Sequence, residues 1–315
     1  MNASEVSLLL SLGIGLEVSA YPKPGNVHRL YDFHDIRFED FIITSHVFQK
    51  YLTTAVKRGF KIEKKRNKVI YGDVIYQITK CSMEIHGGGN VCLGTSILLV
   101  PIAVACGYII YRNKELKVNN ILKYASELVR KYSTIADAVY LYRAIRRIRP
   151  SYIRKSDDTG EFPNVYVKNY CKLLREKKLR FWDVLKASIK RDIISFEVIN
   201  MYSNSMDAHN FLINRLSSGI DWNNAVVDTY LYILSKGIDT MVIREHGEEK
   251  MKYISKNAKE ILDLGGSSTN KGYELLTKLD RELREKGINP GSSADITATA
   301  ISIYTLTHKK QIIHS

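Results

Sequence analysis

The chain has 315 residues, of which 45% are hydrophobic and 25% are charged, as in ordinary globular proteins. This composition excludes intrinsic disorder as the general state of the chain. Lysine and arginine outnumber aspartate and glutamate by 47 to 33, and the resulting net charge of +14 favours polyanionic partners such as nucleotides or nucleic acid.

Two apolar segments in the N-terminal third resemble membrane or export signals. Residues 6–16 form a short one, which lies between Glu5 and Glu17 and has no basic segment before it, so we expect no signal peptide. Residues 91–111 are uncharged over the length of a membrane span, but Gly94, Pro101 and Gly107 interrupt them. We predict a buried core helix here and no membrane association.

The remaining pattern is helical nearly throughout. We expect five glycines to follow helix ends and Asp221 and Ser293 to cap helix starts. The five are Gly59, Gly107, Gly237, Gly265 and Gly287. Apolar residues recur at a spacing of three to four in the predicted helices 35–57, 72–83, 119–148, 181–202, 221–236, 248–264, 271–286 and 293–308.

The sequence shows neither the alternating strand and helix patterns of βαβ units nor a linker. The prediction is an all-α protein in which residues 1–315 form a single compact multi-helix domain. The four cysteines contain no CxxC pair and the eight histidines no HExxH, which excludes a disulfide framework and a zinc site of these kinds. A reducing cytoplasm is the expected location.

Three glycine-rich loops lie between the predicted helices, with the sequences YPKPGN, HGGGNVCLG and NPGSSAD. Loops at helix N-termini gather free backbone N–H groups, and we expect these loops to form a nucleotide site. GxxxxGK[ST] and GxGxxG are absent, so neither a P-loop nor a Rossmann site is predicted. HGGG also occurs in esterases, but no GxSxG accompanies it here.

Four segments together resemble the triphosphoribosyl-dephospho-CoA synthase family. They read EVSAYPKPGNVHR, GGGNVCLGTSILLVPIA, DTMVIREHG and INPGSSADITAT, and they span residues 17–299. The resemblance implies an all-helical transferase that moves the triphosphoribosyl group of ATP to the ribose hydroxyl of dephospho-CoA and releases adenine. On this resemblance ATP is a substrate and Mg²⁺ is the expected cofactor. The oligomeric state is left open, and a homo-oligomer is one option.

The chemistry that this resemblance implies assigns roles to particular side chains. Breaking an N-glycosidic bond calls for a carboxylate, and the triphosphate calls for a cationic clamp with Mg²⁺. The catalytic candidates are Glu17, Asp32 and Asp295, and the metal candidates are Glu17, Asp32, Asp35 and Asp239. The candidates for nucleotide binding are Lys23, Pro24, Gly25, Asn26, His28, Gly89, Asn90, Gly94, Thr95, Arg244, Gly291, Ser292 and Ser293.

Lys23 is the most specific of these candidates, because the turn itself gives little structural reason for a lysine between two prolines. We expect PKPGN to be a rigid cradle in which Lys23 and nearby N–H groups contact the triphosphate. As a polar turn residue, Lys23 is expected to contribute little to the core, so that its replacement by alanine weakens ATP binding and leaves the fold intact.

Two departures from the family pattern leave the acceptor open. Cys92 and Leu93 stand where the citrate-lyase branch has a His-Lys pair, and Asn26 and His28 stand where it tends to have Leu and Asp. A transfer to a related acceptor is one alternative, and a nucleotide-binding relative without this activity is another. A basic helical nucleic-acid-binding protein is a third, although no helix-turn-helix or RNP-like motif supports it.

Overall fold

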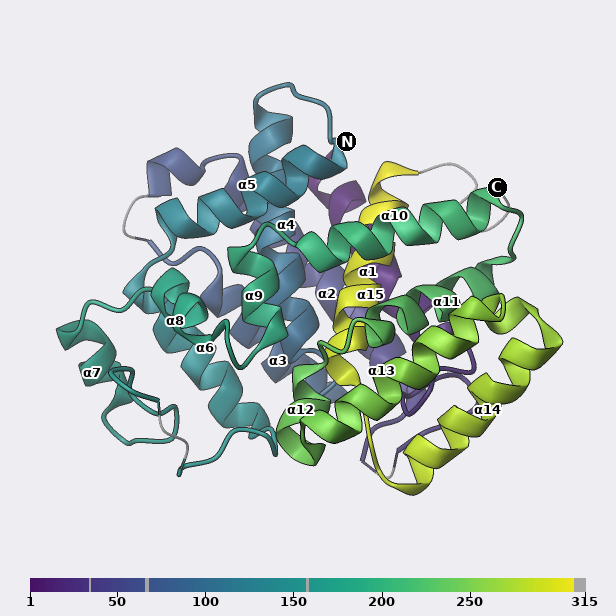
Figure 1. Cartoon of the computed structure of the whole chain (residues 1–315). Coiled ribbons are helices and arrows are strands. Elements are labelled where there is room, and N and C mark those ends of the chain that lie inside the picture. The colour runs from purple at the N-terminus through teal and green to yellow at the C-terminus, as the bar shows by residue number, and fades with distance from the viewer. Residues whose placement is uncertain (34, 66–67, 157–158, 309–315) are drawn as a thin grey trace. The chain divides into compact units, whose positions relative to one another are not determined.

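The structure, a computed structural model, describes residues 1–33, 35–65, 68–156 and 159–308. These residues form fifteen α-helices, two short 3-10 helices and no sheet (Figure 1). The all-α prediction is confirmed. The contacts divide the chain into two compact units, and the expectation of a single domain stays a prediction.

Unit 1 comprises Met1–Ser11 and Ile43–Tyr202. Helices α1 (Ala3–Ser19) and α2 (Phe38–Gly59) contribute residues to both units. Within unit 1, α3 packs against α6 and α4 against α5, α3 and α9. The helices of this unit are α3 (Gly72–His86), α4 (Leu93–Tyr111), α5 (Val118–Tyr132), α6 (Ile135–Ile148), α7 (Tyr170–Glu176), α8 (Phe181–Ser188) and α9 (Ile193–Ile199), with a 3-10 turn at Ile62–Lys65.

Helix α4 is the apolar segment that the sequence analysis predicted to be a core helix. Among the described residues it alone is long and apolar enough to cross a membrane, and 83% of its most apolar window is buried inside the protein. The helix continues past Gly107 to Tyr111, so the prediction that Gly107 follows a helix end is wrong. A Cβ at Gly107 would lie 2.0 Å from the carbonyl oxygen of Val56, so this glycine serves the close approach of α2 instead.

Unit 2 comprises Leu12–Ile42 and the chain from Ser203 onward. Here α11 packs against α10, α13 and α15, and α13 also contacts α12 and α14 (Figure 1). Its helices are α10 (Ser203–Ser217), α11 (Trp222–Ser235), α12 (Thr240–His246), α13 (Glu248–Asp263), α14 (Asn270–Glu285) and α15 (Gly291–Thr307), with a 3-10 turn at Gly266–Ser268.

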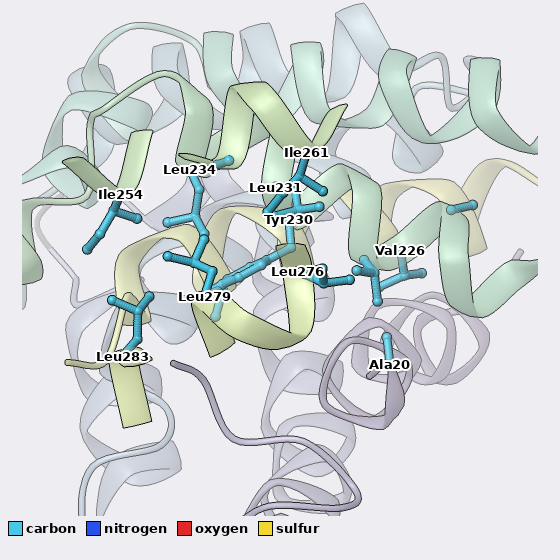
Figure 2. Close-up of a cluster of buried hydrophobic side chains, with 14 of the residues drawn as sticks. Ala20, Val226, Tyr230, Leu231, Leu234, Ile254, Ile261, Leu276, Leu279 and Leu283 are labelled. Carbon is cyan, nitrogen blue, oxygen red and sulfur yellow. The ribbon is translucent and has the colours of Figure 1, made fainter. Parts of the chain in front are cut away.

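The core of unit 2 is formed by the apolar stripes of these helices. Figure 2 shows the Tyr230 ring of α11 extending toward Leu279 of α14, with Leu231 and Ile261 close by. Each of these side chains is buried, and full burial of one such side chain contributes about 1.5–3 kcal/mol. This core fixes α11 and α14, the two helices that hold the loop after α1.

His209 on α10 gives unit 2 a predicted dependence on pH. Its side chain is buried, and burial lowers the pKa of His209 from 6.5 to about 4. Because the unfolded chain binds this proton at a higher pH, stability is full above about pH 6.5 and falls as the pH drops toward 4. The difference corresponds to about 3 kcal/mol.

Urea unfolding at pH 7, 5.5 and 4 checks this dependence on the wild type and on His209→Gln. Carboxylates also titrate over this pH range, but they do so in both proteins. The difference between the two curves of stability against pH therefore isolates the contribution of His209. We expect the variant to lose less stability than the wild type over this range. Parallel pH curves for the two proteins would contradict the prediction.

Candidate functional site

The PKPGN loop follows directly after α1 and is enclosed by unit 2. The five residues of this loop, Pro22 to Asn26, are all buried, and so are the next two residues, Val27 and His28. The bond between Tyr21 and Pro22 is cis, and Gly25 has a φ of 69°, a region that glycine enters without strain. The backbone at this position is therefore one that favours glycine.

Lys23 and Glu17 form a buried ion pair at the base of this loop. The Lys23 ammonium has 0% of its surface exposed; it donates to Glu17 Oε1 and, at 3.1 Å, to Asn26 Oδ1. It also lies 5.8 Å from the centroid of the Tyr230 ring. Burial raises the pKa of the Glu17 carboxyl and lowers that of the Lys23 ammonium, while the attraction between them opposes both shifts.

The backbone of the loop is anchored by two side chains from the helices behind it. Asp280 Oδ1 on α14 accepts the N–H of Gly25 at 3.1 Å, and the hydroxyl of Tyr230 donates to the carbonyl of Pro24 at 2.9 Å. The Asn26 N–H donates to the Lys23 carbonyl at 3.1 Å. The N–H groups that the sequence analysis expected to be available for phosphate thus have acceptors within the protein.

The loop before α15 is joined to the PKPGN loop by a hydrogen bond between two amide side chains. Asn26 Nδ2 donates to Asn289 Oδ1 at 2.9 Å. Asn289 precedes Pro290, after which α15 begins at Gly291. Two of the glycine-rich loops are therefore held side by side in unit 2, although 263 residues separate the two asparagines in sequence.

Asp239 connects a third segment, the start of α12, to the PGSSAD segment. Its Oδ1 accepts the N–H groups of Met241 and Val242 at 3.0 and 3.1 Å at the start of α12, and its Oδ2 accepts the N–H and hydroxyl of Ser293 at 2.7 and 2.8 Å. Burial raises the pKa of Asp239, and these bonds oppose the rise. Ser293 is therefore a donor inside α15, and the prediction that it caps this helix is wrong.

The remaining candidates of unit 2 differ in exposure. Asp32 and Asp35 are exposed, and Asp32 accepts the N–H of Phe38 at 2.8 Å, where α2 begins. Asp295 is half-buried in α15, and Arg244 is half-buried in the last turn of α12. The other three are buried or nearly so: His28, Ser292 and Gly291.

Comparison with known proteins identifies the family to which this chain belongs. A family model described as ATP:dephospho-CoA triphosphoribosyl transferase matches residues 3–313. The chain belongs to this family. The resemblance that the four sequence segments indicated is confirmed, and the transferase activity in the family's name is the activity that the sequence analysis predicted.

A solved structure supports the fold of this transferase family. It comes from Archaeoglobus fulgidus, and its protein is described as a proposed triphosphoribosyl-dephospho-CoA synthase. The two chains are 22% identical, with a TM-score of 0.62, over 84% of this chain and 98% of the other. At this level of identity the likeness establishes the shared helical architecture.

The second glycine-rich loop of the transferase lies in unit 1. Asn90 Oδ1 accepts the N–H groups of Cys92 and Leu93 at 3.3 and 3.1 Å, directly before α4. Gly89, Asn90 and Gly94 are half-buried, whereas Thr95 is buried. Cys92 and Leu93 are buried too, so these positions support the start of α4 and present no charge. The nucleotide roles of this loop stay predictions.

Two side chains that hold the candidate site together were missed by the sequence analysis. Asp280 lies in the run KLDRELREK, which reads as a solvated helix face. Its position four residues after the buried Leu276 places it on the apolar stripe of α14, and this spacing is the signal that could have found it. Tyr230 lies in the predicted helix 221–236, but a sequence does not show which hydroxyl meets a loop carbonyl.

Proposed function

We propose that this transferase uses the joined loops of unit 2 to transfer the triphosphoribosyl group of ATP to the ribose hydroxyl of dephospho-CoA or a related acceptor. One observation carries the proposal. Hydrogen bonds from Asn26 to Asn289 and from Ser293 to Asp239 join three of the four segments that resemble the family. A substrate site requires residues from separate segments to lie close together, and these bonds meet that requirement.

The buried pair of Glu17 and Lys23 acts in this proposal by positioning the loop. A buried ion pair is a costly way to stabilise a turn, so its presence favours a functional role. In the free protein the Lys23 ammonium is already paired, and its contact with the triphosphate stays a prediction. The carboxylates of Asp32 and Asp295 are our candidates for groups that touch the reacting atoms, since both have exposed surface.

Mg²⁺ fits this site only as an ion that arrives with the triphosphate. Among the described residues no group of three or more His, Cys, Asp or Glu side chains is arranged to hold a metal. Mg²⁺ commonly takes one or two carboxylates together with phosphate oxygens and water. The exposed Asp32 and Asp35 suit this role, and the ion would neutralise charge on the triphosphate. The metal role predicted for Asp239 is not needed to explain its burial, because its bonds already do so.

We also propose a cytoplasmic location, which four free cysteines support. The substrates in this proposal are small nucleotides. The nucleic-acid alternative is motivated by the net charge of +14.

A product assay tests the proposed activity. The protein is incubated with ATP, Mg²⁺ and dephospho-CoA, and free adenine is measured by chromatography. We expect adenine to appear only when both substrates are present and to match the loss of dephospho-CoA. Release of ADP, or no reaction of ATP at all, would contradict the proposal. ADP-ribose in place of dephospho-CoA serves as a control acceptor.

A further inference from the structure

A pocket of about 360 Å³ opens on unit 2 beside α14. Its volume is at the lower end of the range for small-molecule sites, which suits one part of a nucleotide better than a whole coenzyme. The lining residues are Tyr31, Thr277, Arg281, Arg284 and Glu285. All but Tyr31 come from α14, so the pocket is formed by one helix face and the segment after the loop.

Arg284 is held in place on this pocket by two contacts. Its guanidinium lies 4.1 Å from the centroid of the Tyr31 ring and pairs with the fully buried Asp280. Its Nε is buried and has no hydrogen-bond partner among the described residues. A guanidinium fixed by stacking and by a carboxylate loses little freedom when it binds a ligand, and 24% of the Arg284 side chain is exposed.

Arg281 lies three positions before Arg284, and residues at this spacing are neighbours on a helix face. It is exposed, and within the described part of the chain it makes no hydrogen bond or ion pair. The structure thus gives Arg281 no role in holding the fold, and its charge is available to a ligand. Glu285 is also exposed and places a negative charge in the lining of the same pocket.

The pocket is connected to the joined loops through the Asp280 side chain and through the backbone of Tyr31. Asp280 pairs with Arg284 and also accepts the N–H of Gly25 in the PKPGN loop. His28 Nε2 lies 3.7 Å from the other oxygen of Asp280, and the backbones of His28 and Tyr31 exchange two hydrogen bonds of 3.1 and 2.8 Å. A ligand in the pocket would therefore lie directly beside the loop.

We propose that this pocket binds the phosphate chain of a nucleotide substrate through Arg281 and Arg284. Two guanidinium groups on one face match the oxygens of adjacent phosphates, to which arginine donates in a planar fork. The chain is either the triphosphate of ATP or the diphosphate of a dephospho-CoA-like acceptor, and the chemistry of recognition is the same for both. This inference rests on the proposed function for the identity of these two substrates.

The variant Arg281→Ala tests the pocket without disturbing the fold. We expect it to raise the KM of one substrate about tenfold and to leave kcat nearly unchanged, because the lost contact is made equally in the ground and transition states. A raised KM for ATP assigns the donor triphosphate, and a raised KM for dephospho-CoA assigns the acceptor diphosphate. Unchanged KM values for both substrates would overturn the proposal.

Two control variants separate a specific contact from the general charge of the surface. Lys278→Ala removes an exposed positive charge from the same helix outside the lining of the pocket, and it should change neither KM. Glu285→Gln removes the negative charge in the pocket and should lower the affected KM about threefold. An equal rise of KM in Lys278→Ala and Arg281→Ala would also overturn the proposal, since a diffuse field would then suffice.

Calorimetry distinguishes a failure of this inference from a failure of the proposed function. ATP, dephospho-CoA and inorganic tripolyphosphate are titrated separately into wild-type and Arg281→Ala protein. If no transfer occurs but the Kd of one phosphate-bearing probe rises about tenfold in the variant, the pocket stands and the reaction is wrong. If transfer occurs and every Kd is unchanged, the reaction stands and the pocket is wrong.

Discussion

Replacing Lys23 with alanine is expected to lower the free energy of unfolding by about 3–5 kcal/mol, the usual cost of breaking a buried ion pair. The ammonium of Lys23 is fully enclosed, and its removal leaves the Glu17 carboxylate buried without its partner. Urea unfolding followed by circular dichroism measures the loss. This result differs from the sequence-based expectation that the fold would be unaffected, because the lysine proves to be part of the interior.

The double variant Glu17→Gln/Lys23→Met provides the control. It removes both charges and keeps side chains of similar volume, so most of the stability lost in Lys23→Ala should return. ATP binding is then measured on the double variant, where stability no longer confounds the result. If Lys23→Ala unfolds at the same urea concentration as the wild type, the buried pair is not as the structure shows it.

The helices were largely predictable, but their breaks were not. The range 119–148 was predicted as one helix, whereas α5 ends at Tyr132 and α6 begins at Ile135. Thr134 and Asp137 form a capping box at this break, and their spacing of three residues is a signal that apolar periodicity conceals. Likewise, Asp192 caps α9 within the predicted helix 181–202. Periodicity identifies buried faces, and it continues across a break when both helices pack on the same core.

Glycine shows where sequence reasoning reaches its limit. Gly237, Gly265 and Gly287 follow helix ends with positive φ, as predicted. Gly107 looks the same in the sequence, yet it lies inside α4, where another helix comes close. A sequence indicates that a side chain is absent but does not show whether φ or a neighbouring backbone is the reason.

The candidate site was predictable as a set of segments and unpredictable as a geometry. The residue types and the order of PKPGN and PGSSAD indicated the family. The sequence did not show that Asn26 meets Asn289 or that Asp239 meets Ser293. These bonds depend on how α11, α12, α14 and α15 pack, and that packing follows from the apolar core of unit 2 as a whole.

Gly25→Ala is expected to reduce kcat/KM about a hundredfold, because a displacement of about 1 Å between substrate-positioning groups has an effect of this size. A Cβ at Gly25 would lie 2.4 Å from the carbonyl oxygen of Ile288 and 2.8 Å from Leu283 Cβ. Ile288 directly precedes Asn289, so the added methyl group would push apart the two loops that Asn26 and Asn289 join. Adenine release at saturating and limiting ATP measures the effect.

Gly287→Ala is the matched control for this prediction. Gly287 has a φ of 63°, close to the 69° of Gly25, so alanine meets the same backbone strain of about 1–2 kcal/mol at either position. However, a Cβ at Gly287 would meet nothing within 4 Å, whereas the one at Gly25 overlaps the backbone of the loop before α15. Gly287→Ala should therefore lose some stability and retain its activity. Equal losses of activity in the two variants would show that strain alone matters, and that the close approach of the loops does not carry the function.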